Sequence, residues 1–252
     1  LMGTFGSDKK LTPYLDSLYQ QSLSFSHFYS SGIHTNHGIY STLYSFPAIM
    51  KRNAMKGSVI PVYSGLPTVL QENGYCSMTH ESQYDNMNAF LRTNGFDEIY
   101  AQENYPSEKV VNSFGVQDDF MYQYALPILN ERAGTGNPFF SVLLSISNHP
   151  PYVIPPYFHP HSDVLEEQIV EYADWSIRQF MQAAEKQPWF DNTIFVFLGD
   201  HGKMVGTPEC EMPQSYNHIP LMIYGKDIKP GVYDGFGGQV DVSPTLLGLL
   251  NI

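Results

Sequence analysis

Apolar residues in this chain fall into short continuous runs and into longer stretches with helical spacing. The clearest run is TIFVFLGDHG at residues 193–202, in which five of the six residues from 194 to 199 are apolar. A short apolar run that stops at glycine is typical of a strand buried on both faces. The remaining predicted strands lie at residues 24–29, 75–79, 139–147, 219–224 and, as a short segment, 239–242.

Apolar residues three or four positions apart predict helices between these strands. In residues 11–23 leucines recur near helical spacing, Thr12 can cap the segment and Pro13 suits its first turn. Further helices are predicted at residues 35–43, 65–73, 84–91, 118–132 and 165–184, and Ser243 and Pro244 begin the last one. Strands that alternate with helices predict one α/β domain over residues 1–252, with a mainly parallel central sheet and helices on both faces.

Polar residues follow several of the predicted strands. Asp200 and His201 end the run at residues 193–202, and His80 and His149 each follow another strand. The carboxyl ends of parallel strands share one edge of a sheet, where ligands bind in open α/β folds. Thr35 begins a predicted helix, where backbone N–H groups favour an anion. We therefore expect these side chains to meet at one site.

The residue types at this edge suggest metal chemistry. An adjacent carboxylate and imidazole, such as Asp200 and His201, suit a divalent metal ion. The alternative is that Asp200 caps a turn and His201 lies on the surface, while the other histidines cap strand ends or pair with neighbours. The spacing of the residues does not exclude this alternative.

Composition and charge narrow the class of protein. The chain has 252 residues, of which 42% are hydrophobic and 15% charged, so it can bury a full core. A formal net charge of −12 argues against a nucleic-acid partner. No run of about 20 apolar residues predicts a membrane span. Cys76 and Cys210 can pair only if the fold brings them together.

Six segments of the chain, in this order, resemble a known superfamily. They read LTPYLDSL, SGIHTNHG, SNHPPY, FVFLGDHG, NHIPLMIYG and VDVSPTLLGLL. Together they resemble the alkaline-phosphatase/sulfatase superfamily, and most closely its lipoteichoic acid synthase and phosphoglycerol transferase branch. The resemblance covers almost the whole chain and implies an alkaline-phosphatase-like three-layer α/β sandwich.

The resemblance also implies roles for individual residues. Thr35 matches the threonine nucleophile of the family, which is also a metal ligand, and Asp200 and His201 match its paired metal ligands. The residues that match the substrate side of the family's site are His80, Tyr84, Asp85, Asn86, His149 and His218. Among them, His149 matches a histidine that contacts the transferred phosphate. For His218, an equal alternative is that it is a loop histidine without a role in the site.

Two departures from the family pattern bear on function. True sulfatases carry a C/S-x-P-x-R motif whose Cys or Ser is oxidised to formylglycine, whereas residues 34–38 here read HTNHG. Sulfate ester hydrolysis is therefore not expected. The family takes a further Glu metal ligand from the end of its first strand, which would lie before Leu1. We expect the domain to continue beyond both ends of this sequence, and metal binding to be poor without that Glu.

These observations predict a metal-dependent phosphotransferase. Coordination to a divalent cation favours the alkoxide of a threonine hydroxyl, which can attack phosphorus. The resemblance implies Mn²⁺ or Mg²⁺, with Zn²⁺ as an alternative, and transfer of a phosphoglycerol-type group from an anionic lipid headgroup or another phosphoester. It implies the extracytoplasmic face of a bacterial membrane, with membrane contact only through segments outside this chain.

Two other functions remain open at this stage. One is a phosphodiesterase or a sulfatase-like ester hydrolase on the same fold. The other is a non-catalytic binding domain, which a genuine loss of the upstream Glu would favour.

Overall fold

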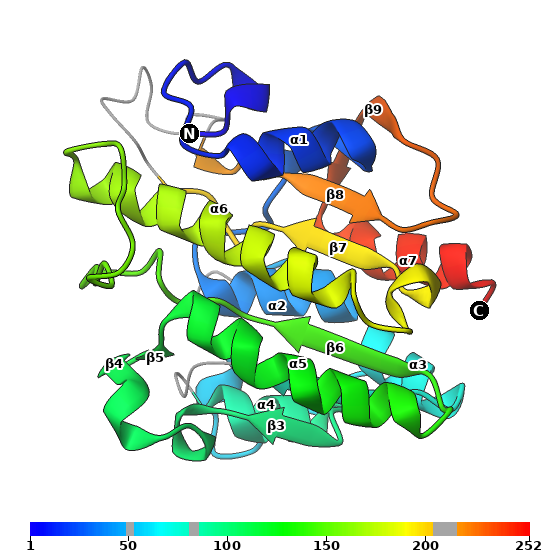
Figure 1. Ribbon diagram of the computed structural model, residues 1–252. Helices are drawn as coiled ribbons and strands as arrows, with labels where there is room; N and C mark the ends of the chain where they lie inside the picture. Colours follow the sequence, from blue (N-terminus) through cyan, green and yellow to red (C-terminus); the bar gives the residue numbers. More distant parts are fainter. Residues whose placement is uncertain (49–52, 81–85, 204–215) are drawn as a thin grey trace.

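Two β-sheets lie at the centre of this protein, whose computed structural model describes residues 1–252 except 49–52, 81–85 and 204–215 (Figure 1). The larger sheet has the order β7 (Phe195–Leu198), β8 (Leu221–Tyr224), β1 (Leu23–Tyr29) and β9 (Gly231–Gly238). The smaller sheet is parallel throughout and has the order β3 (Glu98–Tyr100), β2 (Cys76–His80) and β6 (Phe139–Leu143). A separate antiparallel pair joins β4 (Val110–Asn112) to β5 (Gly115–Val116).

Helices connect these strands and cover them. They are α1 (Pro13–Gln21), α2 (Thr35–Tyr44), α3 (Leu66–Glu72), α4 (Met87–Thr93), α5 (Asp118–Gly134), α6 (Leu165–Ala184) and α7 (Val242–Leu250). Short 3₁₀ helices lie at Gly3–Phe5, Ala54–Lys56, Gln102–Asn104, Ser107–Lys109, Phe190–Asn192 and Gln239–Asp241. Among the described residues, no helix has the length and apolar character that a membrane span needs.

The side chains of β7 alternate between two hydrophobic clusters on opposite faces of the sheet. Phe195 and Phe197 pack with residues of α5 and α6, whereas Val196 and Leu198 pack with residues of α3 and α7. This alternation has the period of two that a strand requires. Because both faces of β7 are covered by helices, the strand lies in the middle of three layers (Figure 1). The predicted α/β class, with helices on both faces, is confirmed.

Aromatic packing joins the two sheets. The ring of Trp189 meets Phe139 of β6 edge-on at 5.9 Å and lies 6.3 Å from Phe195 of β7. The Trp189 indole also donates a hydrogen bond of 2.6 Å to Asn130 Oδ1 in α5. A buried Trp of this kind contributes both apolar area and one fixed polar contact. It therefore anchors α5 against the junction of β6 and β7.

Strand β8 runs antiparallel to both of its neighbours, β7 and β1, while β9 pairs with β1 in parallel. Its first residue, Leu221, pairs with Leu198 at the end of β7. Just before β8, His218 forms a bridge with Tyr29 at the end of β1. The start of β8 and the ends of β1 and β7 therefore meet at one edge of the sheet. The segments that leave this edge carry Thr35 and Asp200.

Two local predictions differ from the structure. Thr12 makes no capping hydrogen bond to α1, because the carboxylate of Asp174 accepts the N–H groups of Tyr14 and Leu15. The predicted strand at residues 239–242 is wrong: Gly238 N donates to the side chain of Asp241, and a 3₁₀ helix forms there.

The boundaries of two other predicted elements also differ from those in the structure. The predicted helix at residues 84–91 begins at Met87, and Tyr84 and Asp85 lie outside the described residues. The predicted strand at residues 139–147 ends at Leu143. Cys210 also lies outside the described residues, so its pairing with Cys76 stays open.

Candidate active site

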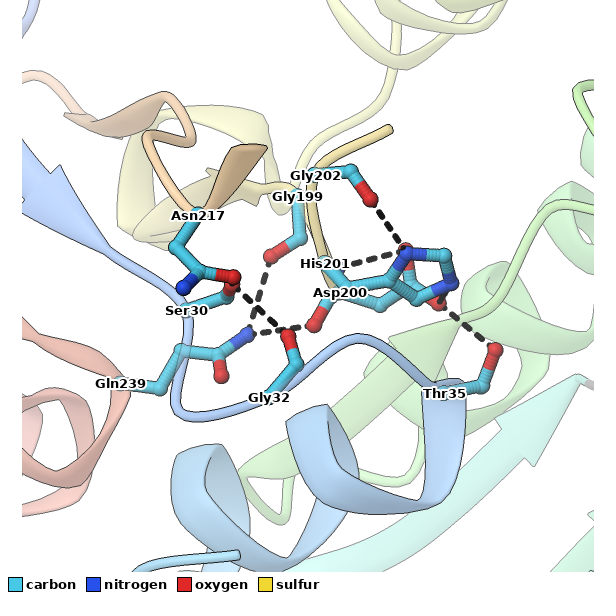
Figure 2. Close-up of polar contacts among 9 residues, drawn as sticks. All are labelled: Ser30, Gly32, Thr35, Gly199, Asp200, His201, Gly202, Asn217 and Gln239. Atoms are coloured by element: carbon cyan, nitrogen blue, oxygen red, sulfur yellow. Dashed lines mark hydrogen bonds and ion pairs between the residues drawn. The ribbon is translucent and has the colours of Figure 1, made fainter. Parts of the chain in front are cut away.

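Thr35 is the first residue of α2, and its hydroxyl points to the end of β7. Thr35 Oγ1 donates a hydrogen bond of 2.8 Å to Asp200 Oδ2 (Figure 2). The preceding residue, His34, has extended backbone and its side chain does not cap the helix. Gly38 lets the helix approach closely, because a Cβ there would lie 2.3 Å from the Asp200 carbonyl oxygen. The first turn of α2 thus packs directly on the backbone of Asp200.

Asp200 and His201 are fixed by local hydrogen bonds where β7 ends. Asp200 Oδ1 accepts the backbone N–H of His201 at 2.9 Å. His201 Nδ1 lies 2.8 Å from the carbonyl oxygen of Gly202. Because a carbonyl oxygen only accepts, we assign the proton to Nδ1, which leaves a lone pair on Nε2 of the neutral ring. Nε2 lies 3.5 Å from Asp200 Oδ2.

The three side chains carry oxygen and nitrogen donors of the kind that bind divalent cations. Two ligands bound at about 2.1 Å are about 3.0–3.5 Å apart in octahedral or tetrahedral geometry. Asp200 Oδ2 lies 2.8 Å from Thr35 Oγ1 and 3.5 Å from His201 Nε2. The described residues contain no group of three His, Cys, Asp or Glu side chains that could hold a metal ion. Thr35, Asp200 and His201 have the donors for part of a coordination shell, in which the 2.8 Å hydrogen-bond separation of Thr35 and Asp200 would have to widen slightly.

Contacts that the sequence did not indicate hold the loops of the site together. Ser30, which follows β1, donates its N–H to the Asn217 carbonyl oxygen at 2.7 Å. The buried amide of Gln239 bonds the backbone on both sides of the site. It accepts a hydrogen bond from Ser31 N on one side and donates to the carbonyl oxygens of Gly199 and Asp200 on the other (Figure 2). Neither Asn217 nor Gln239 had a predicted role, since their partners are distant in the sequence.

His37 is a further residue near the site that the sequence prediction did not include. It follows Thr35 by two positions and is 4% exposed, and its Nδ1 has no hydrogen-bond partner among the described residues. Burial lowers the pKa of His37, and the neighbouring His34 and His201 lower it further. The HTNHG motif contains this histidine two positions after Thr35, and that proximity was the signal available in the sequence.

His149 lies on the loop after β6 and is exposed. Its Nδ1 lies 2.7 Å from the Pro150 carbonyl oxygen, and its ring packs 3.8 Å from the ring of Phe114. The same loop carries Tyr152, whose hydroxyl contacts Lys203 Nζ, just after the Asp200 loop. The ammonium of Lys203 also lies 4.8 Å from the centre of the Tyr152 ring. This contact links the loops after β6 and β7 and supplies a local cation in an acidic chain.

His80 lies in the core in this structure. Its exposure is 0%, and its ring stacks on Tyr100 at 4.8 Å. Neither ring nitrogen has a hydrogen-bond partner among the described residues. Burial lowers the pKa of His80 to about 4. No described contact joins His80 to Thr35 or Asp200, so the structure does not bring it into the group around Thr35.

The remaining predicted residues have structural contacts. His218 Nε2 lies 2.8 Å from the Ser26 carbonyl oxygen, and the ring stacks on Tyr29. Asn86 precedes α4 in the left-handed conformation (φ 61°), and its amide donates to the Met55 carbonyl oxygen. Tyr84 and Asp85 lie outside the described residues. Thr35, Asp200 and His201 are thus the predicted residues that the structure brings together.

The family assignment rests on the whole chain. Residues 1–252 match the profile of the Sulfatase family. The chain belongs to the sulfatase family. This family lies in the alkaline phosphatase superfamily, and its members generally use a divalent metal. The prediction made from the six motifs is confirmed at this level.

Solved structures and curated relatives agree with this assignment. A protein of the alkaline phosphatase superfamily from Vibrio parahaemolyticus is 31% identical, with a TM-score of 0.90 over 100% of this chain and 63% of that chain. The lipoteichoic acid synthase LtaP from Listeria monocytogenes is 25% identical, with a TM-score of 0.85 over 96% of this chain and 66% of that chain. Lipoteichoic acid synthase 2 from Bacillus subtilis is 23% identical over 97% of this chain, which spans 42% of that relative.

Proposed function

We propose that this chain is the catalytic domain of a metal-dependent phosphotransferase that moves a phosphoglycerol-type group from a lipid headgroup through Thr35. The observation that carries the proposal is the contact of Thr35 Oγ1 with Asp200 Oδ2 at the start of α2, beside His201 Nε2. A nucleophilic hydroxyl needs such a neighbour, because it is a weak nucleophile at neutral pH.

Thr35, Asp200, His201 and His149 have different roles in the attack on phosphorus. Thr35 directs its proton at Asp200, so a lone pair of Oγ1 is available to attack phosphorus. When bound at Thr35, Asp200 and His201, a divalent cation would favour the threonine alkoxide and offset charge on the phosphoryl oxygens. We propose Mn²⁺ or Mg²⁺, with Zn²⁺ as the alternative, and His149 as a contact to the phosphate.

The transfer then proceeds in two balanced halves. Oγ1 of Thr35 bonds to phosphorus while the bond from phosphorus to the lipid oxygen breaks, and the Thr35 proton, directed at Asp200, passes to the leaving diacylglycerol. The oxygen of an acceptor hydroxyl next bonds to phosphorus while the bond from phosphorus to Oγ1 breaks, and the acceptor's proton restores the Thr35 hydroxyl. The other predicted substrate-side residues, His80, Tyr84, Asp85, Asn86 and His218, stay predictions under this proposal.

Three considerations support this class of reaction. The residues at 34–38 lack the formylglycine motif of true sulfatases. Relatives that match 97% of the chain are named lipoteichoic acid synthases, which supports glycerol phosphate as the transferred group. An extracytoplasmic location on a bacterial membrane follows by the same analogy, with the anchor outside this chain. The chain spans 42% of the length of these relatives. The lipid donor and the acceptor used by the whole protein are therefore part of the proposal.

The test is to trap the covalent intermediate. Full-length protein is incubated with Mn²⁺ and vesicles of phosphatidylglycerol, and its peptides are analysed by mass spectrometry. We expect one glycerophosphoryl group on the peptide that contains Thr35. Thr35→Ala should give no adduct and lose orders of magnitude in rate, while its fold survives because the change removes one hydrogen bond, which is worth about 1 kcal/mol.

A hydroxyl further along α2 provides the matched control. Ser41 is buried and donates to the Phe46 carbonyl oxygen, so Ser41→Ala should keep the adduct. An adduct on another residue, or robust hydrolysis of an aryl sulfate, would contradict the proposal. Release of glycerol phosphate to water faster than to an added glycolipid would instead identify a phosphodiesterase.

A further inference from the structure

The side chain of Gln239 lies between the two loops that carry Thr35 and Asp200. Its exposure is 0%. Gln239 Oε1 accepts the N–H of Ser31 at 2.9 Å. As Figure 2 shows, Nε2 donates to the carbonyl oxygens of Gly199 at 3.1 Å and Asp200 at 2.7 Å. All three bonds go to backbone atoms. One amide therefore holds the backbone on both sides of the candidate site.

Sheet pairing does not hold these two loops together. Thr35 follows β1 and Asp200 follows β7, and β8 lies between these two strands. Adjacent strands are about 4.8 Å apart, so β1 and β7 are separated by about 10 Å. The contact between Thr35 and Asp200 thus depends on how the loops turn toward each other beyond the strand ends. Gln239 bonds both loops at that point.

Further hydrogen bonds fix the backbone around Gln239. It begins a 3₁₀ helix that the hydrogen bond from Gly238 N to Asp241 Oδ2 closes at 2.8 Å. The next helix, α7, is tied to α2 by a bond of 2.6 Å from Ser243 Oγ to the Thr42 carbonyl oxygen. The amide is therefore anchored to the same helix that begins with Thr35.

We propose that Gln239 is a positioning residue that sets the separation of the Thr35 hydroxyl and the Asp200 carboxylate. A side-chain amide suits this role because it combines an acceptor and two donors in one planar group. In the structure Gln239 bonds the backbone and acts on the site through Thr35 and Asp200. The catalytic consequences rest on the proposed function, whereas the geometric consequence does not.

The matched comparison uses a second buried amide. Gln239→Met keeps the length of the side chain and removes its three hydrogen bonds. Asn94 has the same bonding pattern and 0% exposure, since Oδ1 accepts Tyr63 N at 2.6 Å and Nδ2 donates to the carbonyl oxygens of Pro61 at 3.1 Å and Phe90 at 2.8 Å. None of these partners is on the loops of the site. Asn94→Leu therefore controls for the loss of a buried amide.

Three quantities are measured in the full-length protein and both variants. They are the melting temperature in EDTA, the Kd for Mn²⁺ by electron paramagnetic resonance, and turnover with phosphatidylglycerol vesicles. We expect both variants to lower the melting temperature. Gln239→Met alone should raise the Mn²⁺ Kd by about 10- to 100-fold, as the loss of a residue supporting metal ligands does, and should lower kcat more than it raises KM.

A third variant separates the two sides of the amide. Gln239→Glu keeps an acceptor for Ser31 N and loses the donors to the Asp200 side, so it should weaken Mn²⁺ binding as Gln239→Met does. If Gln239→Met does not fold, Gln239→Glu takes its place in every measurement. An unchanged Mn²⁺ affinity in the Gln239 variants, or an equal loss in Asn94→Leu, would overturn the proposal.

Crystal structures provide the test that is independent of metal and activity. In the Gln239→Met structure, Thr35 Oγ1 and Asp200 Oδ2 should lie beyond hydrogen-bond distance. A separation that stays at 2.8 Å, as in the unmodified chain, would refute the positioning role. If the wild-type protein binds no Mn²⁺ and shows no turnover, the proposed function fails, and this separation alone decides the role of Gln239.

Discussion

Replacing His80 by phenylalanine should change how the stability of the protein depends on pH. The imidazole is 0% exposed, stacks on Tyr100 with ring planes 15° apart, and meets Tyr124 edge-on at 6.3 Å. Phenylalanine can make the same ring contacts without burying two nitrogens that have no partner among the described residues. The substitution therefore removes a titrating group and keeps an aromatic side chain in its place.

The expected size of the effect follows from the pKa of His80, which burial lowers from 6.5 to about 4. Above pH 6.5 the ring is neutral in the folded and the unfolded chain, and it adds no pH dependence. As the pH falls from 6.5 to 4, the unfolded chain binds a proton that the folded chain does not, so the free energy of unfolding decreases. Below about pH 4 this loss is complete at ~3 kcal/mol, because a tenfold change in proton affinity is worth ~1.4 kcal/mol.

The assay is urea denaturation in EDTA, followed by tryptophan fluorescence, at intervals from pH 7 to pH 4. Relative to wild type, His80→Phe should gain stability progressively across this window. It should also be more stable by ~1 kcal/mol at pH 7, since unpaired buried polar atoms are costly. His159→Phe, at an exposed position, controls for the removal of a histidine. If the difference between His80→Phe and wild type is the same at pH 7 and pH 4, the reasoning from burial is wrong.

Two further substitutions test the candidate site. His149→Ala should lower turnover by about 10²-fold with little change in melting temperature, because the side chain is exposed and is proposed to contact the phosphate; unchanged turnover would remove it from the site. Gly38→Ala places a Cβ 2.3 Å from the Asp200 carbonyl oxygen, so α2 must shift and turnover should fall by about 10²-fold. The control Gly134→Ala, where a Cβ meets nothing within 4 Å, should leave turnover unchanged; equal losses in the two glycine variants would contradict this argument.

The elements predicted most accurately are those whose own sequence determines burial. Helix α6 begins and ends where the pattern placed it, and β7 was predicted within a residue or two of its ends because both of its faces are apolar. The edge strand β9 was missed, since GVYDGFGG has several glycines and its side chains are mostly exposed. A strand that packs on one neighbour leaves little pattern in its sequence.

The sequence predicted the residues that carry the chemistry of the site, but not the residues that position them. The GDHG motif and the helix start at Thr35 indicated the residues that now lie within hydrogen-bond distance. Gln239 could not be found this way, because its partners are backbone atoms of loops that are distant in the sequence. The burial of His80 could not be predicted from the sequence either. A histidine at the end of a strand has the same sequence pattern whether its ring faces solvent or the core.

The strand order of the larger sheet has a consequence for how the protein folds during synthesis. Strand β1 is formed by residues near the start of the chain, but both of its partners, β8 and β9, come from Leu221–Tyr224 and Gly231–Gly238. The bond from Ser31 to Gln239 spans 208 residues, which take about 10–40 s to synthesise at 5–20 residues per second. Throughout that time both edges of β1 are open to incorrect pairing, so chains released before residue 221 should aggregate rather than fold.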